Sequence, residues 1–287
     1  MSTGRLLVCA TPIGNLGDVT VRVLDALRDA DLVVAEDTRI TRRLLARYDI
    51  SARLEPYHAH NLDRRTPVLI DRMRRGARIA LVSDAGTPGI SDPGAHLVDA
   101  CLQTGIAVDV LPGPSAIVSA LVASGLPTHA FYFGGFLPRK VGERGERLAS
   151  LSALDATLVF YESPRRAPST AVALAAAFPS REAAMARELT KVHEEVVRGS
   201  VEELAQMLAS RELKGEVVLL VGPPPRGHAA VAPDPAEVLV RIAELQSQGV
   251  SRSSAVKQVA AEYGMARNEA YRIAHGEVAD AKRAMER

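Results

Sequence analysis

Short apolar segments alternate with helical ones through the first 115 residues, and this alternation restricts the fold more than any other feature of the sequence. Each apolar segment is rich in Val, Leu or Ile and has the length of a buried strand. These strands are predicted at Leu6–Ala10, Asp31–Glu36, Arg78–Asp84 and Ala107–Leu111. Between them, Thr20–Ala30 and Thr66–Gly76 place apolar side chains on one helical face. Strands that alternate with helices form βαβ units, so we expect a parallel sheet covered by helices.

The pattern changes after Ser115, where further strands follow one another with shorter connections. They are predicted at Tyr132–Leu137, Ala156–Tyr161, Ala183–Glu188, Val192–Arg198 and Gly215–Val221. Some of the connections are too short for a crossover helix, which indicates a second sheet of mixed direction. The sequence therefore predicts two α/β domains, residues 1–113 and 114–222.

A segment rich in Pro and Gly, residues 223–234, comes next and is typical of a linker. Residues 235–287 differ in composition and are expected to form helices only. Within them, Ser251–Tyr263 and Ala266–His275 are helical segments separated by a turn at Gly264. This arrangement predicts a small helix-turn-helix module at the end of the chain.

The composition excludes several classes of protein. With 47% hydrophobic and 24% charged residues, the chain of 287 residues falls in the globular range. No apolar run approaches the roughly 20 residues of a membrane helix, and no signal peptide is visible, so we expect a cytoplasmic protein without a membrane partner. Cys9 and Cys101 lie in apolar stretches and are expected to be reduced core thiols.

Four loops that directly follow predicted strands are rich in Gly, Pro, Asp, Ser and Thr. They are Ala10–Asp18, Glu36–Arg39, Ser83–Gly94 and Leu111–Ala116. Turn chemistry alone explains any one of them, but four at successive strand ends indicate a ligand site, because open parallel sheets bind ligands there. No Gly-x-Gly-x-x-Gly loop after a strand and no P-loop occurs, which disfavours ordinary dinucleotide and P-loop binding.

Seven segments, in order along the chain, resemble a single protein family. They are Thr11–Asp18, Glu36–Arg39, Tyr57–Asn61, Ser83–Gly94, Pro112–Ala116, Tyr161–Arg165 and Arg187–Lys191. On these segments the chain resembles the ribosomal RNA small subunit methyltransferase I family, a branch of the tetrapyrrole methylase-like, class III S-adenosylmethionine-dependent methyltransferases. The resemblance covers residues 5–222, and the tail from about Asp234 resembles the family's C-terminal helix-turn-helix. Pro164–Arg166 departs from the family form, which carries a His at Arg166 or its neighbour.

The resemblance implies a homodimeric enzyme that uses S-adenosyl-L-methionine to methylate the ribose 2′-oxygen of a cytidine in the decoding region of small-subunit (16S) ribosomal RNA. Its substrate would be the free RNA or the assembled small subunit. The family binds the cofactor, folded up, in a cleft between two α/β domains. Carried onto this chain, the cofactor-binding residues are Pro12, Ile13, Gly14, Asp84, Gly86, Thr87, Ser115, Ala116 and Tyr161.

Methyl transfer from a sulfonium depends mainly on positioning the nucleophile and excluding water. A ribose hydroxyl is a poor nucleophile, so a base or a cation that stabilises an alkoxide is expected. The candidates in or beside the motifs at strand ends are Glu36, Asp37, Glu162, Glu188 and Lys191. Each could instead form a structural ion pair or helix cap. Of these, Glu162 and Lys191 are the predicted catalytic residues.

Charge is distributed unevenly along the chain. Between Arg39 and Arg78, eleven arginines oppose four acidic residues, so this segment carries +7 although the whole chain carries +1. Because Arg forms paired hydrogen bonds to phosphate, the segment predicts an RNA footprint. The predicted RNA-binding residues are Arg39, Arg42, Arg43, His60, Arg74 and Arg75. His58 and His60 have no clear third ligand, so no metal site is predicted.

Two other functions are compatible with parts of the sequence. The same fold and cofactor could serve a tetrapyrrole or a protein side chain as methyl acceptor, but a small macrocycle needs neither the basic segment nor the C-terminal module. A non-enzymatic helix-turn-helix regulator that binds nucleic acid would leave the four loops unexplained. The tail from Pro235 also carries eight basic and seven acidic residues, which is not typical of a DNA reader.

Overall fold

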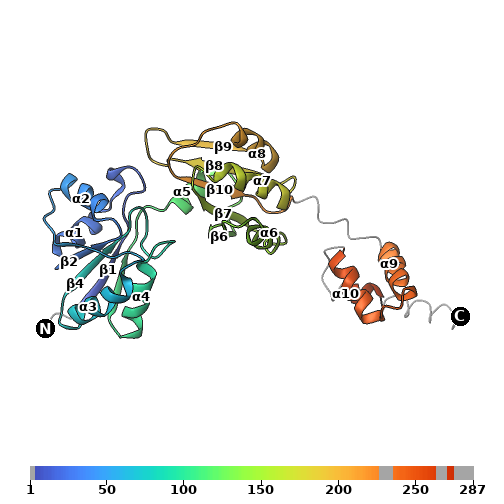
Figure 1. The fold of residues 1–287 in the computed structure, drawn as a ribbon, viewed down its shortest axis with the longest axis horizontal. Helices are drawn as coiled ribbons and strands as arrows, with labels where there is room; N and C mark the ends of the chain where they lie inside the picture. Colours follow the sequence, from blue (N-terminus) through green and yellow to red (C-terminus); the bar gives the residue numbers. More distant parts are fainter. Residues whose placement is uncertain (1–3, 226–234, 263–269, 275–287) are drawn as a thin grey trace. The chain divides into compact units, whose positions relative to one another are not determined.

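The computed structural model describes residues 4–225, 235–262 and 270–274, and Figure 1 traces its elements along the chain. The chain divides into two compact units, Met1–Pro223 and Pro224–Arg287. Within the described ranges, no helix combines the length and the apolar character that a membrane span requires.

The first half of the larger unit is built around a parallel sheet with the strand order β3-β2-β4-β1-β5. Its strands are β1 (Arg5–Cys9), β2 (Leu32–Ala35), β3 (Leu54–Pro56), β4 (Arg78–Val82) and β5 (Ala107–Leu111). The helices that connect them are η1 (Leu16–Asp18), α1 (Val21–Asp29), α2 (Thr38–Arg47), α3 (Leu62–Arg74) and α4 (Gly94–Gln103). Apolar side chains of α1 and α2 pack on one face of the sheet, and those of α3 and α4 pack on the other.

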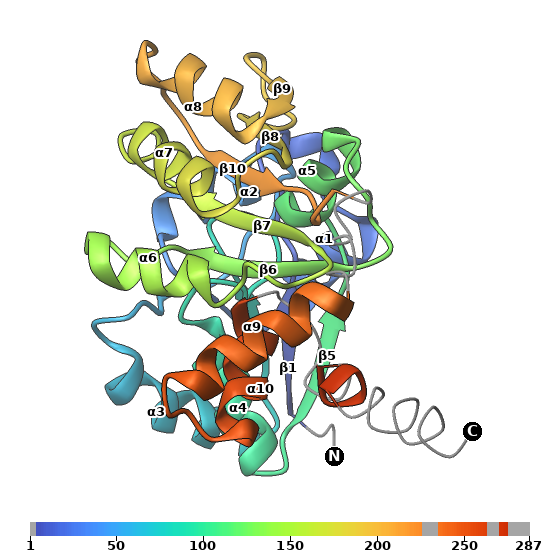
Figure 2. The same cartoon turned by 90° about the vertical axis from the view of Figure 1, so that its right-hand side faces the viewer.

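The second half is built around a mixed sheet with the strand order β6-β7-β10-β8-β9. Its strands are β6 (Phe131–Phe136), β7 (Thr157–Glu162), β8 (Glu182–Arg187), β9 (Glu195–Ser200) and β10 (Val217–Val221). Its helices are α5 (Ala116–Ser124), α6 (Val141–Ala149), α7 (Ala167–Ala177) and α8 (Val201–Ala209). Figure 2 shows α6, α7 and α8 beside one another; they cover one face of the sheet, and α5 packs on the other.

The predicted α/β architecture with a parallel and a mixed sheet is confirmed. β6 runs parallel to β7, whereas β10 is antiparallel to both of its neighbours. Each of the nine predicted strands is present, with ends displaced by at most three residues, and β5 has the predicted bounds. The largest displacement is in β9, because Val192 lies fully exposed in a turn before the strand. β3, which is only three residues long, was not predicted.

Two complete helices are described in the smaller unit, α9 (Pro235–Ser247) and α10 (Arg252–Glu262). Their buried side chains, among them Val238, Ile242 and Val256, form a core of their own. Residues 270–274 are also helical and contribute Ala270 and Ala274 to this core. The predicted turn at Gly264 and most of the predicted linker lie outside the described residues.

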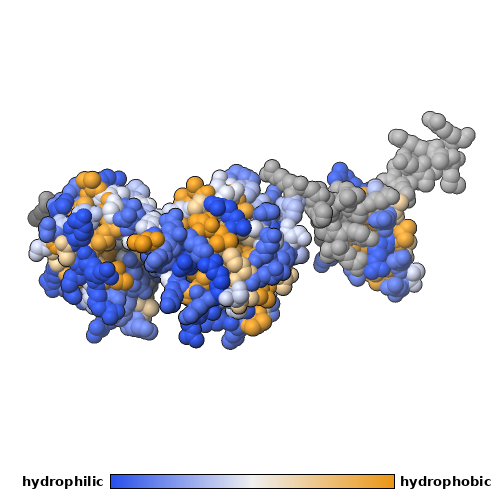
Figure 3. All heavy atoms as spheres, turned by 90° about the horizontal axis from the view of Figure 1, so that it is seen from above, coloured by the Kyte–Doolittle hydropathy of each residue, from blue (hydrophilic) through white to orange (hydrophobic). Residues whose placement is uncertain are grey.

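Both cysteines are buried in the first half of the larger unit and neither is in a disulfide. Burial raises the pKa of the Cys9 thiol to about 12 and that of Cys101 to about 11. Both thiols are therefore protonated at neutral pH and unreactive, as predicted for core cysteines. On the face drawn in Figure 3, hydrophilic residues predominate and smaller hydrophobic patches lie between them.

Candidate active site

A cavity of about 440 Å³ is lined by residues from both sheets of the larger unit. From the first sheet come the loops after β1, β2, β4 and β5, which are the four loops singled out in the sequence. The second sheet contributes the ends of β6, β7 and β8 and the start of β10. A volume of this size is typical of a small-molecule site, and its place is where parallel sheets bind ligands.

The loops after β1, β4 and β5 are held together through their backbones. The Thr11 N–H donates to the Gly86 carbonyl at 2.8 Å, and the Gly86 N–H donates back at 3.0 Å. Gly86 has a φ of 78°, in the left-handed region that favours glycine. A Cβ on Gly113 would lie 2.9 Å from the Ala10 Cβ, so only glycine lets these loops meet this closely. The result is a closely packed wall on one side of the cavity.

Carboxylates dominate the charge of the cavity. Its lining includes Glu36, Asp84, Asp92, Glu162 and Glu216, whereas none of the described lining residues is Lys, Arg or His. Burial, together with repulsion from Asp84, Asp92 and Asp37, raises the pKa of Glu36 above its usual value. A cavity with this charge attracts a cation and repels phosphate.

Two of these carboxylates differ in how much of their hydrogen-bonding capacity is used. Asp92 Oδ1 accepts hydrogen bonds from the N–H groups of Gly89 at 2.8 Å and Gly94 at 2.7 Å, so this side chain shapes its own loop. Asp84 Oδ1 accepts from the Asp37 N–H at 2.9 Å, whereas Oδ2 accepts none from the described residues. Burial raises the pKa of both carboxyl groups. Asp84 thus retains an oxygen that could bind an N–H donor of a ligand.

Most of the residues predicted to bind a cofactor lie together at this cavity. Those that line it are Ile13, Asp84, Gly86, Thr87, Ser115, Ala116 and Tyr161. Pro12 and Gly14 flank Ile13 without being part of the lining. A Cβ on Gly14 would lie 2.7 Å from the Leu189 carbonyl oxygen, so this glycine lets the loop after β1 pack against the loop after β8.

Tyr161 belongs to an aromatic group at the cavity. Its ring centroid lies 4.9 Å from that of Phe133 and 5.7 Å from that of Phe136. Burial, with a smaller contribution from Glu216, raises the pKa of Tyr161 to about 12. The side chain is therefore a neutral phenol in an apolar wall, which suits it to pack against a ligand and exclude water.

Glu162, one of the two predicted catalytic residues, lines the cavity but has both oxygens engaged. Oε1 accepts from the Ser163 N–H at 2.8 Å, and Oε2 accepts from the Thr170 hydroxyl at 2.7 Å. Arg166 Nη2 forms an ion pair with Oε2 at 3.2 Å, and the side chain is fully buried. These bonds hold the start of α7 against the end of β7. The catalytic role of Glu162 stays a prediction.

Lys191, the other predicted catalytic residue, is near the cavity but does not line it. Its Nζ donates to Glu188 Oε1 at 2.8 Å and to Glu216 Oε2 at 3.0 Å. Burial alone would lower the pKa of Lys191, but these hydrogen bonds outweigh burial and raise it. Lys191 is therefore cationic at neutral pH and holds Glu216 in the cavity wall. Its catalytic role also stays a prediction.

The six residues predicted to bind RNA lie in three separate places. Arg39, Arg42 and Arg43 are exposed on the first turns of α2, and Arg39 forms an ion pair with Asp37 at 2.6 Å. His60 is exposed in the loop after β3.

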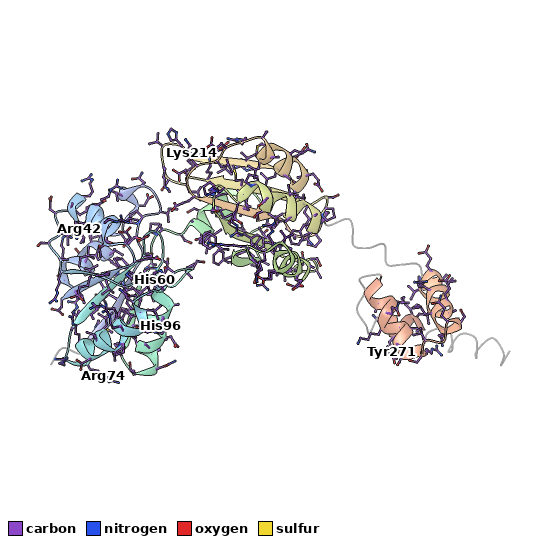
Figure 4. All side chains as sticks on the ribbon, in the orientation of Figure 1. Arg42, His60, Arg74, His96, Lys214 and Tyr271 are labelled. Atoms are coloured by element: carbon purple, nitrogen blue, oxygen red, sulfur yellow. The ribbon has the colours of Figure 1, made fainter. Side chains whose placement is uncertain are left out.

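Arg74 and Arg75 lie at the C-terminal end of α3, just before β4 begins. They are therefore at the opposite end of the strands from the cavity. Figure 4 shows Arg42 and Arg74 far apart.

Four of the lining residues, Glu216, Phe136, Leu189 and Asp92, were not among the predicted site residues. Asp92 lies in a loop that the sequence had singled out, so its position was open to prediction. Glu216 stands before β10 in no recognisable motif. It reaches the cavity because β10 runs antiparallel to β7 and β8, which places its start beside their ends. That pairing is not visible in the local sequence.

Within the described residues, no group of three or more His, Cys, Asp or Glu side chains could hold a metal ion.

The sequence profile of the tetrapyrrole (corrin/porphyrin) methylases matches residues 5–205.

Two curated relatives are similar over most of their length. The ribosomal RNA small subunit methyltransferase I of Mesorhizobium japonicum is 49% identical over 81% of this chain and 79% of the relative. The protein of the same name from Halalkalibacterium halodurans is 42% identical over 96% of both chains.

Among solved structures, the chain is similar to the uroporphyrin-III C-methyltransferase of Thermus thermophilus in complex with S-adenosyl homocysteine. The TM-score is 0.56, with 21% identity over 76% of this chain and 97% of the other. At this identity the likeness extends to the fold alone.

Proposed function

Because the chain belongs to the tetrapyrrole methylase family, and within it to the ribosomal RNA small subunit methyltransferase I family, we propose that it is an S-adenosylmethionine-dependent methyltransferase of small-subunit ribosomal RNA. The acceptor is the ribose 2′-oxygen of a cytidine in the decoding region. Relatives that cover most of the chain carry the ribosomal RNA name, which favours this acceptor over a tetrapyrrole or a protein side chain.

The observation that carries the proposal is the charge of the cavity. Five carboxylic acid residues and no basic side chain line it among the residues described. A sulfonium cofactor carries positive charge and no phosphate, so it fits this lining, whereas a phosphorylated nucleotide does not. S-adenosylmethionine supplies an electrophilic methyl group when it is bound.

The chain's own residues would hold the cofactor and keep water out. The backbones at Ile13 and Ala116 offer hydrogen-bonding groups at the cavity, and Gly86 keeps the wall beside them free of a side chain. Asp84 Oδ2 is available for an amino group. The aromatic wall at Tyr161 excludes water from one side.

We propose that Glu36 is the general base that accepts the proton of the attacking hydroxyl. This carboxylate lines the cavity at the end of β2, and its raised pKa brings it closer to that of an effective general base. Glu162 and Lys191 act beside it as positioning residues in this proposal. Glu162 holds the turn that carries Tyr161 and Ser163 to the cavity, and Lys191 fixes Glu216.

For the RNA, we propose contacts from Arg39, Arg42 and Arg43 of α2 and from His60. All four are exposed, and the three arginines lie at the end of the first sheet where the cavity opens. Arg74 and Arg75 were predicted with them, but their place at the other end of α3 gives them no support as contacts near the reacting nucleotide.

We also propose a homodimer that acts in the cytoplasm and a domain division at 1–113, 114–222, 223–234 and 235–287. The change from the first to the second sheet between β5 and β6 supports the first boundary. Val118 and Val122 are 53% and 68% exposed one turn apart on α5, and this apolar surface supports self-association. Light scattering on the purified protein tests the dimer.

Methyl transfer to purified small subunits tests the proposed function directly. With tritiated S-adenosylmethionine, we expect one methyl group per particle, and mass mapping should place it on the ribose of a single cytidine. Naked RNA as a parallel substrate shows which assembly state is used. No transfer to either substrate, or a methyl group on a base, would contradict the proposal. Calorimetry separates cofactor binding from catalysis, and ATP, which should not bind the acidic cavity, is the matched control.

A further inference from the structure

The helices α6 and α7 both begin next to the cavity. α6 follows β6, whose last residue Phe136 lines the cavity, and α7 follows the lining residues Ser163 and Pro164. Neither helix has a side chain that caps its first N–H groups. At α6 the first N–H groups are therefore open to an anion, whereas at α7 the Ala167 N–H donates to the Ser163 carbonyl at 3.0 Å and Pro168 has no N–H.

Basic residues gather at these two helix starts. The group, called the basic rim below, consists of Arg139, Lys140, Arg144, Arg165 and Arg166. Cations at a helix N-terminus oppose the helix dipole, so this placement costs stability unless an anion is present. The acidic side chains nearby are Glu143 and Glu162, and they pair with Lys140 and Arg166 respectively.

Arg166 connects the two helix starts. Its Nη2 donates to the Leu137 carbonyl at 2.7 Å in addition to pairing with Glu162. The loop before α6 and the turn before α7 are thus held side by side. Arg139 and Arg165 are exposed and have no ion pair among the described residues, so their guanidinium groups are available to a ligand.

Arg144 provides an independent observation. It is only 8% exposed on α6, and its buried Nε has no hydrogen-bond partner. The other buried arginine of the described chain, Arg181, donates to the carbonyls of Gly222 and Ser152 and stacks on Phe178. A buried N–H group without a partner is costly, because burial removes its hydration without compensation.

The direction of helical side chains relates Arg144 to the rest of the rim. Side chains on a helix point toward its N-terminus, so Arg144 lies over the first turn of α6. That turn follows Arg139 and Lys140 directly.

We propose that the basic rim is an anion site that binds a backbone phosphate of the RNA next to the methylated nucleotide. The inference rests on the proposed function for the identity of the ligand. The cavity, with its five carboxylates, repels phosphate, so the phosphates that flank the reacting ribose must be held outside it. The rim meets this need, because Arg165 directly follows the lining residue Pro164 and Arg139 is three residues beyond Phe136.

Charge reversal tests the rim in the enzyme assay. In the double variant Arg139→Glu/Arg165→Glu we expect the KM for the RNA substrate to rise about tenfold or more. The slope of the logarithm of RNA affinity against the logarithm of salt concentration should become less steep, by the equivalent of about one to two phosphate contacts. Cofactor affinity by calorimetry should stay within about twofold, because the cavity is untouched. The control matched in net charge is Arg74→Glu/Arg75→Glu at the C-terminal end of α3, at the other end of the strands. A KM equal to that of the control would overturn the proposal.

Thermal unfolding with inorganic phosphate tests the site without any assumption about the reaction. Compared with chloride at equal ionic strength, phosphate should raise the Tm of the wild type by about 2–4 °C. Arg144→Met removes the buried charge, so its Tm without phosphate should equal or exceed that of the wild type and respond less to phosphate. An equal phosphate response in both proteins would refute the site even if the enzyme methylates RNA. A phosphate response confined to the wild type would support the site even if RNA proved not to be the substrate.

Discussion

At the scale of single residues, hydrogen bonding separates carboxylates that look alike in the sequence. Glu36 ends one predicted strand, Glu162 directly follows another, and both line the cavity. Glu162 has its oxygens bound by Ser163, Thr170 and Arg166, whereas Glu36 faces other carboxylates. The motif could predict that each lies at the site. It could not predict which carboxylate is free, since the partners of Glu162 depend on how α7 packs.

This difference leads to a prediction for a matched pair of variants. Glu36→Gln should lower kcat by about 10²-fold if Glu36 takes the proton. The pKa of Glu36 is raised and its active form is the carboxylate, so wild-type kcat/KM should rise with pH through that pKa. In Glu36→Gln this rise of kcat/KM with pH should disappear.

Glu162→Gln is the comparison for that experiment. It should lower the Tm, because Ser163, Thr170 and Arg166 lose a charged partner, while the rise of kcat/KM with pH remains. If the rise of kcat/KM with pH vanishes in Glu162→Gln and persists in Glu36→Gln, the base is Glu162 and not Glu36.

At the scale of elements, the strands with long apolar runs were predictable and β3 was not. β3 is an edge strand of three residues that pairs with β2 alone, and none of its side chains is fully buried. Its central residue Glu55 is held by ion pairs to Arg53 at 2.9 Å, to Arg72 at 3.1 Å and to Arg65. An edge strand fixed by charge leaves no periodic apolar signal in the sequence.

Glu55→Gln should therefore destabilise the protein at neutral pH, by about 1–2 kcal/mol. Burial alone would raise the pKa of Glu55, but hydrogen bonds from Arg65 and Arg72 outweigh it and lower the pKa. A lowered pKa in the folded state stabilises the protein above the ordinary Glu value, and this contribution is lost as pH falls through the folded-state pKa.

Urea unfolding at several pH values measures this difference. The difference in the free energy of unfolding between the wild type and Glu55→Gln should be largest near pH 7 and become smaller below about pH 4. A gap that does not change with pH would mean that packing, and not the charge of Glu55, accounts for the loss.

At the scale of the whole molecule, charge along the sequence does not predict charge in space. The segment from Arg39 to Arg78 carries +7, but five of its arginines are in ion pairs with Asp37, Glu55 or Asp71. The helices that carry most of the others, α2 and α3, pack on opposite faces of the first sheet. One continuous basic stretch of sequence therefore becomes two separate surfaces. Arg42 and Arg43 lie near the start of α2 at the cavity end of the sheet, whereas Arg74 and Arg75 lie at the C-terminal end of α3, at the other end of the strands.

Two double charge reversals distinguish these surfaces. Arg42→Glu/Arg43→Glu lowers the net charge by four beside the strand ends at the cavity. The KM for small subunits should therefore rise about tenfold or more, and the affinity for RNA should depend less on salt concentration. Arg74→Glu/Arg75→Glu makes the same change in net charge at the far end of α3, where we expect the KM to stay within about twofold. Because the net charge of the two variants is equal, an equal rise in KM would mean that the RNA senses the total charge of the protein and not a localised surface. A larger effect from the α3 pair would mean that the RNA binds at the other end of the first sheet. The RNA would then have to pass the edge of that sheet to reach the cavity.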